Sequence, residues 1–199
     1  GVVARKVLPA DVDVVAHALR IGEHEAQTYS RDVIEQNAVR CADPVVASAM
    51  EESILQLKKD GNSIGGLVEI RVHNTPPFLG EPVFAKLKSQ LAHAIMSIGA
   101  VTGFSYGAGF DTARMTGLEY IENRDNFGGL LGGLSTGEDL RLLASIKPTT
   151  SVADVARRGR HDPCIVPRVI PVLEAMVAVV LANAWLTDRA RRPDQRGGG

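Results

Sequence analysis

Several polar residues stand together just before a long apolar segment near the end of the chain. The stretch is Gly159-Arg160-His161-Asp162-Pro163-Cys164. A cation, an imidazole and a carboxylate at the N-terminus of a helix can bind an anion and transfer a proton. A surface loop in which Asp162 caps the following helix has the same composition. The local chemistry leaves both interpretations open.

A second group of hydrogen-bond donors follows a segment of alternating apolar residues. Lys147-Pro148-Thr149-Thr150-Ser151 offers one ammonium group and three hydroxyls, and Pro148 stiffens the chain at that point. Phosphate recognition uses such donors, with Lys as a point charge and hydroxyls adding hydrogen bonds. No GxxxxGK precedes the run, so it is not a Walker P-loop. An ordinary turn is the alternative interpretation.

A third stretch is unusually rich in glycine. The ten residues from Gly128 to Gly137 hold five glycines among apolar residues. Repeated glycine lets the backbone approach a flat ligand or another backbone closely. The pattern is not GxGxxG, which argues against a Rossmann dinucleotide site. A ligand contact and a tight crossing of strands are both compatible with it.

The histidines and cysteines show no metal-binding pattern. No pair among the five histidines has the spacing of HExxH, and Cys41 and Cys164 lie far apart and form no CxxC. We therefore expect no metal site and no disulfide framework. The free thiols favour a reduced, cytoplasmic protein.

Length and composition are those of a globular protein. The chain has 199 residues, of which 45% are apolar and 23% charged, and its net charge is −1. This balance excludes a disordered chain and gives no general attraction to nucleic acid. The most apolar stretch, Val177 to Leu186, is too short to span a bilayer, so we expect no membrane partner.

The apolar periodicity predicts alternating helices and one-sided strands. This order favours an α+β fold over a doubly wound parallel sheet. We expect a single domain over residues 1–190 and a disordered tail over 191–199. The segment Gly1 to Leu8 is expected to be the last part of a helix. Further helices are expected from Asp43 to Gly61 with Asp43 as N-cap, over Pro82 to Ile98, briefly over Phe110 to Thr116, and over Pro167 to Arg192; strands are expected at Val14 to Ile21, Val68 to His73, Ala100 to Gly109 and Leu140 to Ile146.

Taken together, these stretches resemble chorismate synthase. The resemblance runs in order across almost the whole chain and ends in GRHDPC, which makes it specific although each segment alone is weak. Ala42, Asn62 and Ser105 depart modestly from the pattern of the family. The matching segments are Arg40-Cys41-Ala42-Asp43, Gly61 to Gly66, Leu79 to Phe84 with Lys86-Leu87, Met96 to Val101, Gly103-Phe104, Gly107 to Phe110, Gly128 to Gly137, Lys147-Pro148-Thr149, and Gly159 to Cys164 with Pro167-Arg168.

The resemblance implies an enzyme of the shikimate pathway. Such a lyase converts 5-enolpyruvylshikimate 3-phosphate to chorismate by 1,4-elimination of phosphate, and it requires reduced FMN. The implied fold is a β-α-β sandwich with long helices between antiparallel sheets, usually assembled as a homotetramer. Whether an NADPH-dependent activity of the protein or an external enzyme reduces the flavin stays open.

The resemblance also assigns residue roles by position. Arg160 matches an arginine at the FMN and substrate pocket, and Asp162 matches the residue that manages a proton on the flavin N5. A carboxylate beside N5 can control its protonation. The positions that match FMN contacts are Gly99, Ala100, Gly132, Lys147, Pro148, Thr149, Thr150, Ser151 and Arg160.

Part of the family pattern is absent from this chain. The Gly-Glu-Ser-His-Gly stretch, several substrate-binding arginines and a second histidine do not occur. We therefore expect this chain to be the C-terminal part of such an enzyme and to be inactive alone. The alternatives are a non-catalytic FMN-binding module and an oligomer-forming subunit without chemistry. The reading frame upstream of Gly1 would distinguish them.

Overall fold

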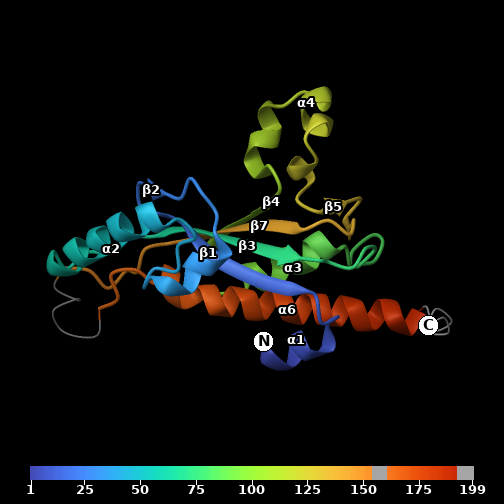
Figure 1. Cartoon of the computed structure of the whole chain (residues 1–199), viewed down its shortest axis with the longest axis horizontal. Helices are drawn as coiled ribbons and strands as arrows, with labels where there is room; N and C mark the ends of the chain where they lie inside the picture. Colours follow the sequence, from blue (N-terminus) through green and yellow to red (C-terminus); the bar gives the residue numbers. More distant parts are fainter. Residues whose placement is uncertain (154–160, 192–199) are drawn as a thin grey trace.

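A computed structural model describes residues 1–153 and 161–191 (Figure 1). It combines long helices with an antiparallel sheet, as the α+β prediction requires. The elements in chain order are α1 (Val2–Val7), β1 (Asp13–Ile21), β2 (His24–Glu25), η1 (Arg31–Gln36), α2 (Pro44–Lys59), β3 (Gly66–His73), α3 (Leu87–Met96), β4 (Val101–Tyr106), η2 (Gly109–Arg114), α4 (Gly117–Glu122), η3 (Arg124–Phe127), β5 (Leu130–Leu131), β6 (Leu134–Ser135), β7 (Leu140–Ile146) and α6 (Val166–Arg191).

The central sheet has five strands in the order β2-β1-β3-β7-β4, all antiparallel. Strand β3 lies in the middle, and its register places Glu69 opposite His17 on one side and Arg71 opposite Arg141 on the other. Because side chains alternate across a strand, these polar residues share one face of the sheet. The buried apolar residues of β3 and β7 point to the other face, where they form the core.

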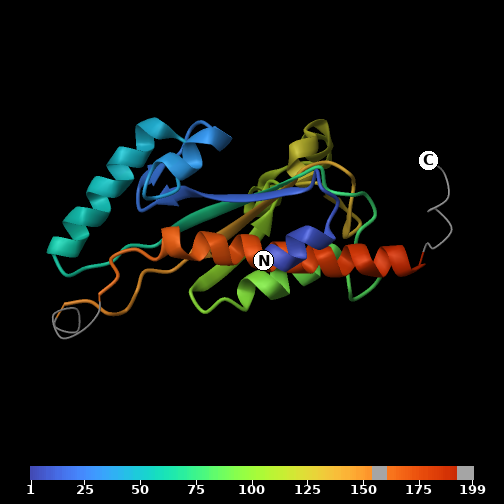
Figure 2. The ribbon, with the colours of Figure 1, turned by 60° about the horizontal axis from the view of Figure 1, so that its bottom comes forward.

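Helices α3 and α6 cover the apolar face of the sheet, and α1 lies against α6 (Figure 2). Helix α6 buries Ile170, Leu173 and Val177 in the same core as the strands. Burying each of these side chains contributes about 1.5–3 kcal/mol. Helix and sheet are therefore held together by apolar contacts between segments that are far apart in the sequence.

Helix α6 differs from the expectation for the apolar stretch near the C-terminus. Within the described residues it is the one helix long and apolar enough to cross a membrane by length and composition, with a mean hydropathy of 2.0. The segment Val177 to Leu186 is thus part of a longer helix of 26 residues. Half of the most apolar window is buried inside the protein. Because α6 packs against β1, β3 and α3, it is a core helix.

Helix α2 begins as its sequence predicts. Asp43 is the N-cap, and its carboxylate Oδ1 accepts hydrogen bonds from the backbone N–H groups of Val45 (3.0 Å) and Val46 (3.4 Å). Pro44 occupies the first helical position, where its missing N–H removes no intrahelical bond. The strands predicted at Val14 to Ile21, Val68 to His73 and Leu140 to Ile146 are also confirmed.

The helix predicted over Pro82 to Ile98 is wrong in its first part. Helix α3 starts at Leu87, and Phe84, which lies within the predicted helix, is 91% exposed. Val83 has a φ of +68°, a conformation that a β-branched residue cannot hold within a helix. A hydrogen bond from Glu81 N to Ala85 O (2.9 Å) closes this segment as a turn.

The helix predicted over Phe110 to Thr116 is a 3₁₀ helix, η2, that ends at Arg114, and a new helix starts at Gly117. A separate helix, α4, begins there because Thr116 and Glu119 form a capping box, a signal present in the sequence that the prediction overlooked. Helices η2, α4 and η3 form an arm that stands away from the sheet (Figure 1). At the other end, α6 includes Arg191, which the prediction placed in the tail; residues 192–199 lie outside the described part of the chain.

Candidate functional site

Three loops converge at the end of the sheet where β7 stops and α6 starts. They are residues 61–65 before β3, 147–153 after β7, and 161–165 before α6. The register of β3 and β7 brings the first two together, because Gly66 pairs with Ile146. A Cβ atom on Gly65 would lie 2.3 Å from Ile146 O and 3.0 Å from Pro148 N. The two backbones therefore approach more closely than any side chain at residue 65 permits.

Hydrogen bonds link the Lys147–Ser151 run to the residues around Asp162. Thr149 donates from Oγ1 to the Asp162 carbonyl oxygen at 2.8 Å, and Ser63 donates from Oγ to Thr149 O at 2.7 Å. Ile64 N donates to Pro163 O at 2.8 Å. These bonds join three segments that are up to 100 residues apart in the sequence into one cluster, which we call the loop cluster (residues 61–65, 147–153 and 161–165).

His161 lies at the centre of the loop cluster. Its Nδ1 is 2.6 Å from the carbonyl oxygen of Ser151 and its Nε2 is 2.9 Å from that of Asn62. Carbonyl oxygens only accept hydrogen bonds, so both contacts are hydrogen bonds when each ring nitrogen carries a proton. A neutral ring satisfies one of them. His161 thus connects the loop of Asn62 with the loop of Ser151.

Asp162 forms an ion pair instead of a helix cap. Its carboxylate is 2.9 Å from Nη1 of Arg168, and the side chain is 21% exposed. The residue before α6 is Ile165, whose carbonyl accepts hydrogen bonds from Arg168 N and Val169 N. Because Asp162 lies four residues before the helix, the alternative in which it caps α6 is wrong.

Gly99 and Ala100 lie beside the loop cluster. Lys147 N donates to Ala100 O at 3.0 Å, which places the turn before β4 next to the start of the Lys147–Ser151 run. The side chain of Lys147 is exposed, as are Pro148 and Thr150. A Cβ atom on Gly99 would meet no heavy atom within 4 Å, so its backbone borders open space.

Two of the predicted site residues lie elsewhere. Arg160 belongs to residues 154–160, outside the described part of the chain. Gly132 lies in the β5–β6 hairpin, which contacts the start of β7 through Gly129 and the start of α3 through Gly133. Lys147 follows the other end of β7, and a strand of this length separates the two by roughly 20 Å. The chain therefore does not bring Gly132 to the loop cluster.

In the part of the chain that the structure describes, Cys164 forms no metal centre with the residues of the loops. Burial raises the pKa of the Cys164 thiol to about 11, which keeps it protonated and unreactive at neutral pH. No group of three or more His, Cys, Asp or Glu side chains that could hold a metal ion occurs within residues 1–153 and 161–191.

A cluster of polar residues around the buried Glu69, which sequence reasoning missed, lies on the polar face of the sheet. Glu69 is 1% exposed, and its carboxylate is within hydrogen-bond distance of Nε2 of His17 (3.0 Å), Nε of Arg71 (2.6 Å) and Nε of Arg141 (2.6 Å). Burial alone would raise the pKa of Glu69, but these three contacts outweigh it and lower the pKa to about 2. We call these four residues the Glu69 cluster.

The polar face is covered around Glu69 because the segment after β2 folds back over it. Tyr29 packs with its ring 3.9 Å from the Arg71 guanidinium, and Ile34 and Ala42 are buried against Val15. The alternation of apolar and polar residues along β3 predicts a wet face at Glu69. That expectation is wrong, because alternation reports side-chain direction and not what lies above the sheet.

The fold and the loop cluster together define an α+β protein that presents a lysine and hydroxyl groups at one end of an antiparallel sheet. The family model described as chorismate synthase matches residues 1–186. The chain therefore belongs to the chorismate synthase family, and the resemblance inferred from its motifs is confirmed.

Curated relatives and a solved structure agree with this assignment. Chorismate synthase from Cyanothece sp. is 40% identical over 221 residues, and the match covers 96% of this chain and 61% of the relative. The enzyme from Methanosarcina mazei is 42% identical over 204 residues, covering 88% and 56%. A crystal structure of chorismate synthase superposes with a TM-score of 0.77 at 25% identity, covering 89% of this chain and 57% of that one. The predicted fold class is confirmed, and the chain spans 56–61% of the length of these relatives.

Proposed function

We propose that the complete protein carrying this chain converts 5-enolpyruvylshikimate 3-phosphate to chorismate by 1,4-elimination of phosphate. The observation that best supports this proposal is the 2.8 Å hydrogen bond from Thr149 Oγ1 to Asp162 O. It joins two motifs to which the family resemblance assigns FMN and proton chemistry, although the sequence separates them. The match of the family model over residues 1–186 supports the same reaction.

Reduced FMN is the cofactor in this proposal, and when bound it supplies electron density to the substrate as phosphate leaves. The residues present fit such a group. Lys147 and Thr150 are exposed and can donate hydrogen bonds to its phosphate, with Thr149 and Ser151 beside them. The open space at Gly99 lets the backbone of Gly99 and Ala100 lie against a flat ring.

Asp162 is the proposed proton-handling residue. Its carboxylate lies 2.9 Å from the Arg168 guanidinium, and a carboxylate is a group that can accept a proton. Pro148 removes one backbone donor after β7 and fixes the direction in which Lys147 leaves the strand. Arg160, by the family resemblance, would hold an anionic group of the FMN or the substrate.

We also propose the homotetramer and the cytoplasmic location that the resemblance implies. Within one chain, Gly132 lies roughly 20 Å from Lys147 along β7. In a homo-oligomer, Gly132 of one copy would be able to approach the flavin held by the loop cluster of another. This arrangement would explain why one chain separates two positions that both match FMN contacts in the family.

The test joins residues 1–199 to the part of the Methanosarcina mazei relative that this chain does not cover. Formation of chorismate from 5-enolpyruvylshikimate 3-phosphate is measured without oxygen, in the presence and absence of reduced FMN. We expect turnover that depends on reduced FMN. Lys147→Gln in the same fusion protein should weaken FMN binding by about tenfold or more, because a charge-assisted bond is lost.

The non-catalytic alternative predicts a different result in the same experiment. A fusion protein that is folded by circular dichroism and binds reduced FMN, yet forms no chorismate, would overturn the proposed reaction. A fusion protein whose turnover does not depend on FMN would overturn the proposed cofactor. Comparison with the complete Methanosarcina mazei enzyme supplies the reference rate.

A further inference from the structure

Two arginines face each other on the polar side of the sheet. Arg71 of β3 and Arg141 of β7 are direct cross-strand partners. Like charges placed directly opposite on neighbouring strands repel each other. Glu69 offsets this repulsion, because its two carboxylate oxygens accept one hydrogen bond from each guanidinium. One buried carboxylate shared by two guanidiniums leaves a net positive charge at this place.

Each arginine uses only its Nε in the Glu69 cluster. No acceptor within residues 1–153 and 161–191 bonds the terminal nitrogens of Arg71 or Arg141. The two side chains are 31% and 42% exposed, so these nitrogens are within reach of a ligand. The ring of Tyr29 and the bonds to Glu69 hold the guanidiniums in place, so binding costs little ordering of side chains.

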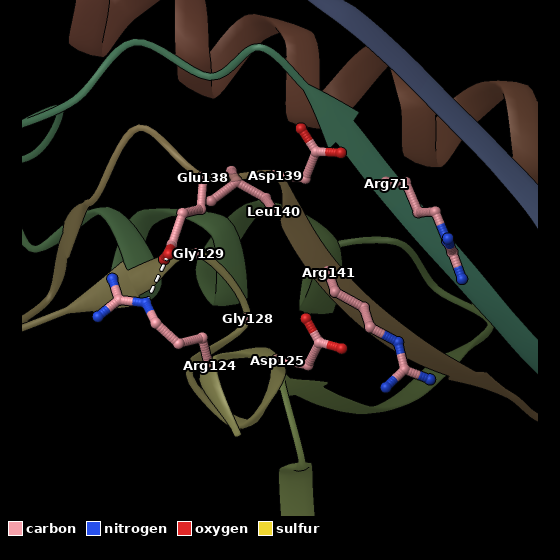
Figure 3. Close-up of a pocket in the computed structure, with 9 residues that line it drawn as sticks. All are labelled: Arg71, Arg124, Asp125, Gly128, Gly129, Glu138, Asp139, Leu140 and Arg141. Atoms are coloured by element: carbon pink, nitrogen blue, oxygen red, sulfur yellow. Dashed lines mark hydrogen bonds and ion pairs between the residues drawn. The ribbon is translucent and has the colours of Figure 1, made fainter. Parts of the chain in front are cut away.

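A cavity of about 330 Å³ opens beside the pair. Figure 3 shows the side chains of Arg71 and Arg141 extending in the same direction from their neighbouring strands. Three acidic residues also line the cavity, and two of them already have partners. Glu138 pairs with Arg124 at 2.6 Å, and Asp139 contacts His73 at 2.6 Å.

Asp125, from η3, is the third acidic residue of the cavity. Its carboxylate makes no hydrogen bond or ion pair with another residue in the described part of the chain. A ligand at this place therefore meets two guanidiniums with unused donors and one carboxylate with unused acceptors. The matching chemistry is an oxyanion that also carries a hydroxyl group.

We infer that the cavity binds a small oxyanion, a phosphate or a carboxylate group, through the terminal nitrogens of Arg71 and Arg141, and that Asp125 accepts a hydrogen bond from a hydroxyl group of the same ligand. Guanidinium groups match the geometry of both oxyanions. The site is separate from the loop cluster, because Arg141 and Lys147 lie at opposite ends of β7, roughly 20 Å apart. It therefore does not rest on the proposed function.

The test titrates the 199-residue chain by calorimetry with four probes: inorganic phosphate, acetate, glycerol 3-phosphate and glycerol. We expect saturable binding of phosphate or acetate, tighter binding of glycerol 3-phosphate than of phosphate, and no binding of glycerol. Binding of phosphate without acetate assigns the site to phosphate ligands, and the reverse assigns it to carboxylates. No saturable binding of either anion overturns the inference.

Variants locate the binding. Arg141→Gln should weaken anion affinity by about tenfold or more, since hydrogen bonds to a charged group are lost. Arg114→Gln, an exposed arginine of η2 away from the cavity, should leave it unchanged. Lys147→Gln removes the other phosphate-binding candidate. Affinity that is lost in Lys147→Gln and kept in Arg141→Gln would assign the anion to the loop cluster and overturn the inference.

Two more variants keep the test decisive if Arg141→Gln fails to fold. Arg141→Lys keeps the positive charge beside Glu69 but loses the guanidinium, so it should fold and bind the anion more weakly. Wild-type affinity in a folded Arg141→Lys protein contradicts the role of Arg141. Asp125→Asn should preserve phosphate binding and reduce the advantage of glycerol 3-phosphate. An undiminished advantage overturns the role of Asp125.

Discussion

Glu69 shows how a single carboxylate can be both buried and ionised. Taking a charge out of water is costly, and the donors from His17, Arg71 and Arg141 compensate for it. The result is a pKa of about 2, below the ordinary value of 4.5. Removing the carboxylate of Glu69 leaves His17, Arg71 and Arg141 without their shared acceptor, and breaking an ion pair at a buried group in this way is destabilising.

Stability should therefore depend on the protonation of Glu69. Because the pKa in the folded state is the lower one, the contribution is complete above pH 4.5 and is lost as the pH falls toward 2. The difference in pKa corresponds to about 3 kcal/mol of unfolding free energy. Urea unfolding from pH 7 to pH 2 measures this loss.

The matched variants for this prediction are Glu69→Gln and Glu52→Gln, the second an exposed residue of α2. Glu69→Gln should lower stability at pH 7 by about 3 kcal/mol or more and flatten the acid dependence. Glu52→Gln should keep the wild-type dependence. If Glu69→Gln lost as much unfolding free energy at acid pH as the wild type, the loss could not be assigned to Glu69.

Asp162 permits a test of proton transfer at the residue scale. In a complete protein carrying this chain, Asp162→Asn should lower turnover on the order of 10²-fold, because Asn cannot accept a proton. FMN affinity should change little, since Asn has nearly the same shape. Anaerobic turnover and flavin titration measure the two effects.

Arg168→Gln is the control for Asp162→Asn, because it breaks the same ion pair and keeps the carboxylate. Both variants lose the ion pair, which is partly exposed and contributes little to stability. A purely structural role predicts the same small loss of turnover in both. Equal turnover in the two variants would refute a role for Asp162 in proton transfer.

At the scale of elements, the loop cluster depends on close packing of backbones. Gly65→Ala should destabilise the protein by about 2 kcal/mol, because the added methyl group meets backbone atoms of Ile146 and Pro148. Gly99→Ala adds the same methyl group where no heavy atom lies within 4 Å, and should change stability by less than about 0.5 kcal/mol. Urea unfolding measures both.

The same pair of variants separates folding from cofactor contact. In the complete protein, Gly99→Ala should weaken FMN binding although the fold is intact, because its methyl group would occupy the space proposed for the flavin. Unchanged FMN affinity in Gly99→Ala would show that Gly99 does not contact the cofactor. Unchanged stability in Gly65→Ala would show that the loops can separate at little cost.

At the scale of the whole molecule, this chain carries part of the family's length. It spans 61% of the Cyanothece relative and 56% of the Methanosarcina mazei relative. The histidines and arginines that the family resemblance places in its first region are not among its 199 residues. The described residues supply a sheet, its covering helices and the loop cluster.

We predict that the 199-residue chain alone forms no measurable chorismate. Loss of general acid–base groups alone lowers rates by about 10² to 10⁴, and loss of substrate contacts lowers affinity in addition. An anaerobic assay with reduced FMN and 5-enolpyruvylshikimate 3-phosphate tests this, with the complete Methanosarcina mazei enzyme as the positive control. Turnover comparable to that enzyme would show that this chain holds the complete site.

The sequence by itself determined the family, most of the elements and the motifs with chemical potential. Two of these signals are local: the alternation along β3 and β7, and the Asp43-Pro44 start of α2. Local patterns can be recognised from the order of residues alone. The GRHDPC and KPTTS motifs were recognisable because the sequence gives the chemical type of each side chain. The start of α3 was not predicted, because the positive φ of Val83 is imposed by the contacts of its loop.

Only the tertiary structure decided how these residues meet. The bond from Thr149 to Asp162, the double contact of His161 and the ion pair of Asp162 with Arg168 depend on strand register and on the position of α6. Burial of Glu69 depends on the segment that folds back over the sheet. Such contacts join residues distant in the sequence, and no local pattern encodes them, because their energy is gained only when the whole core has formed.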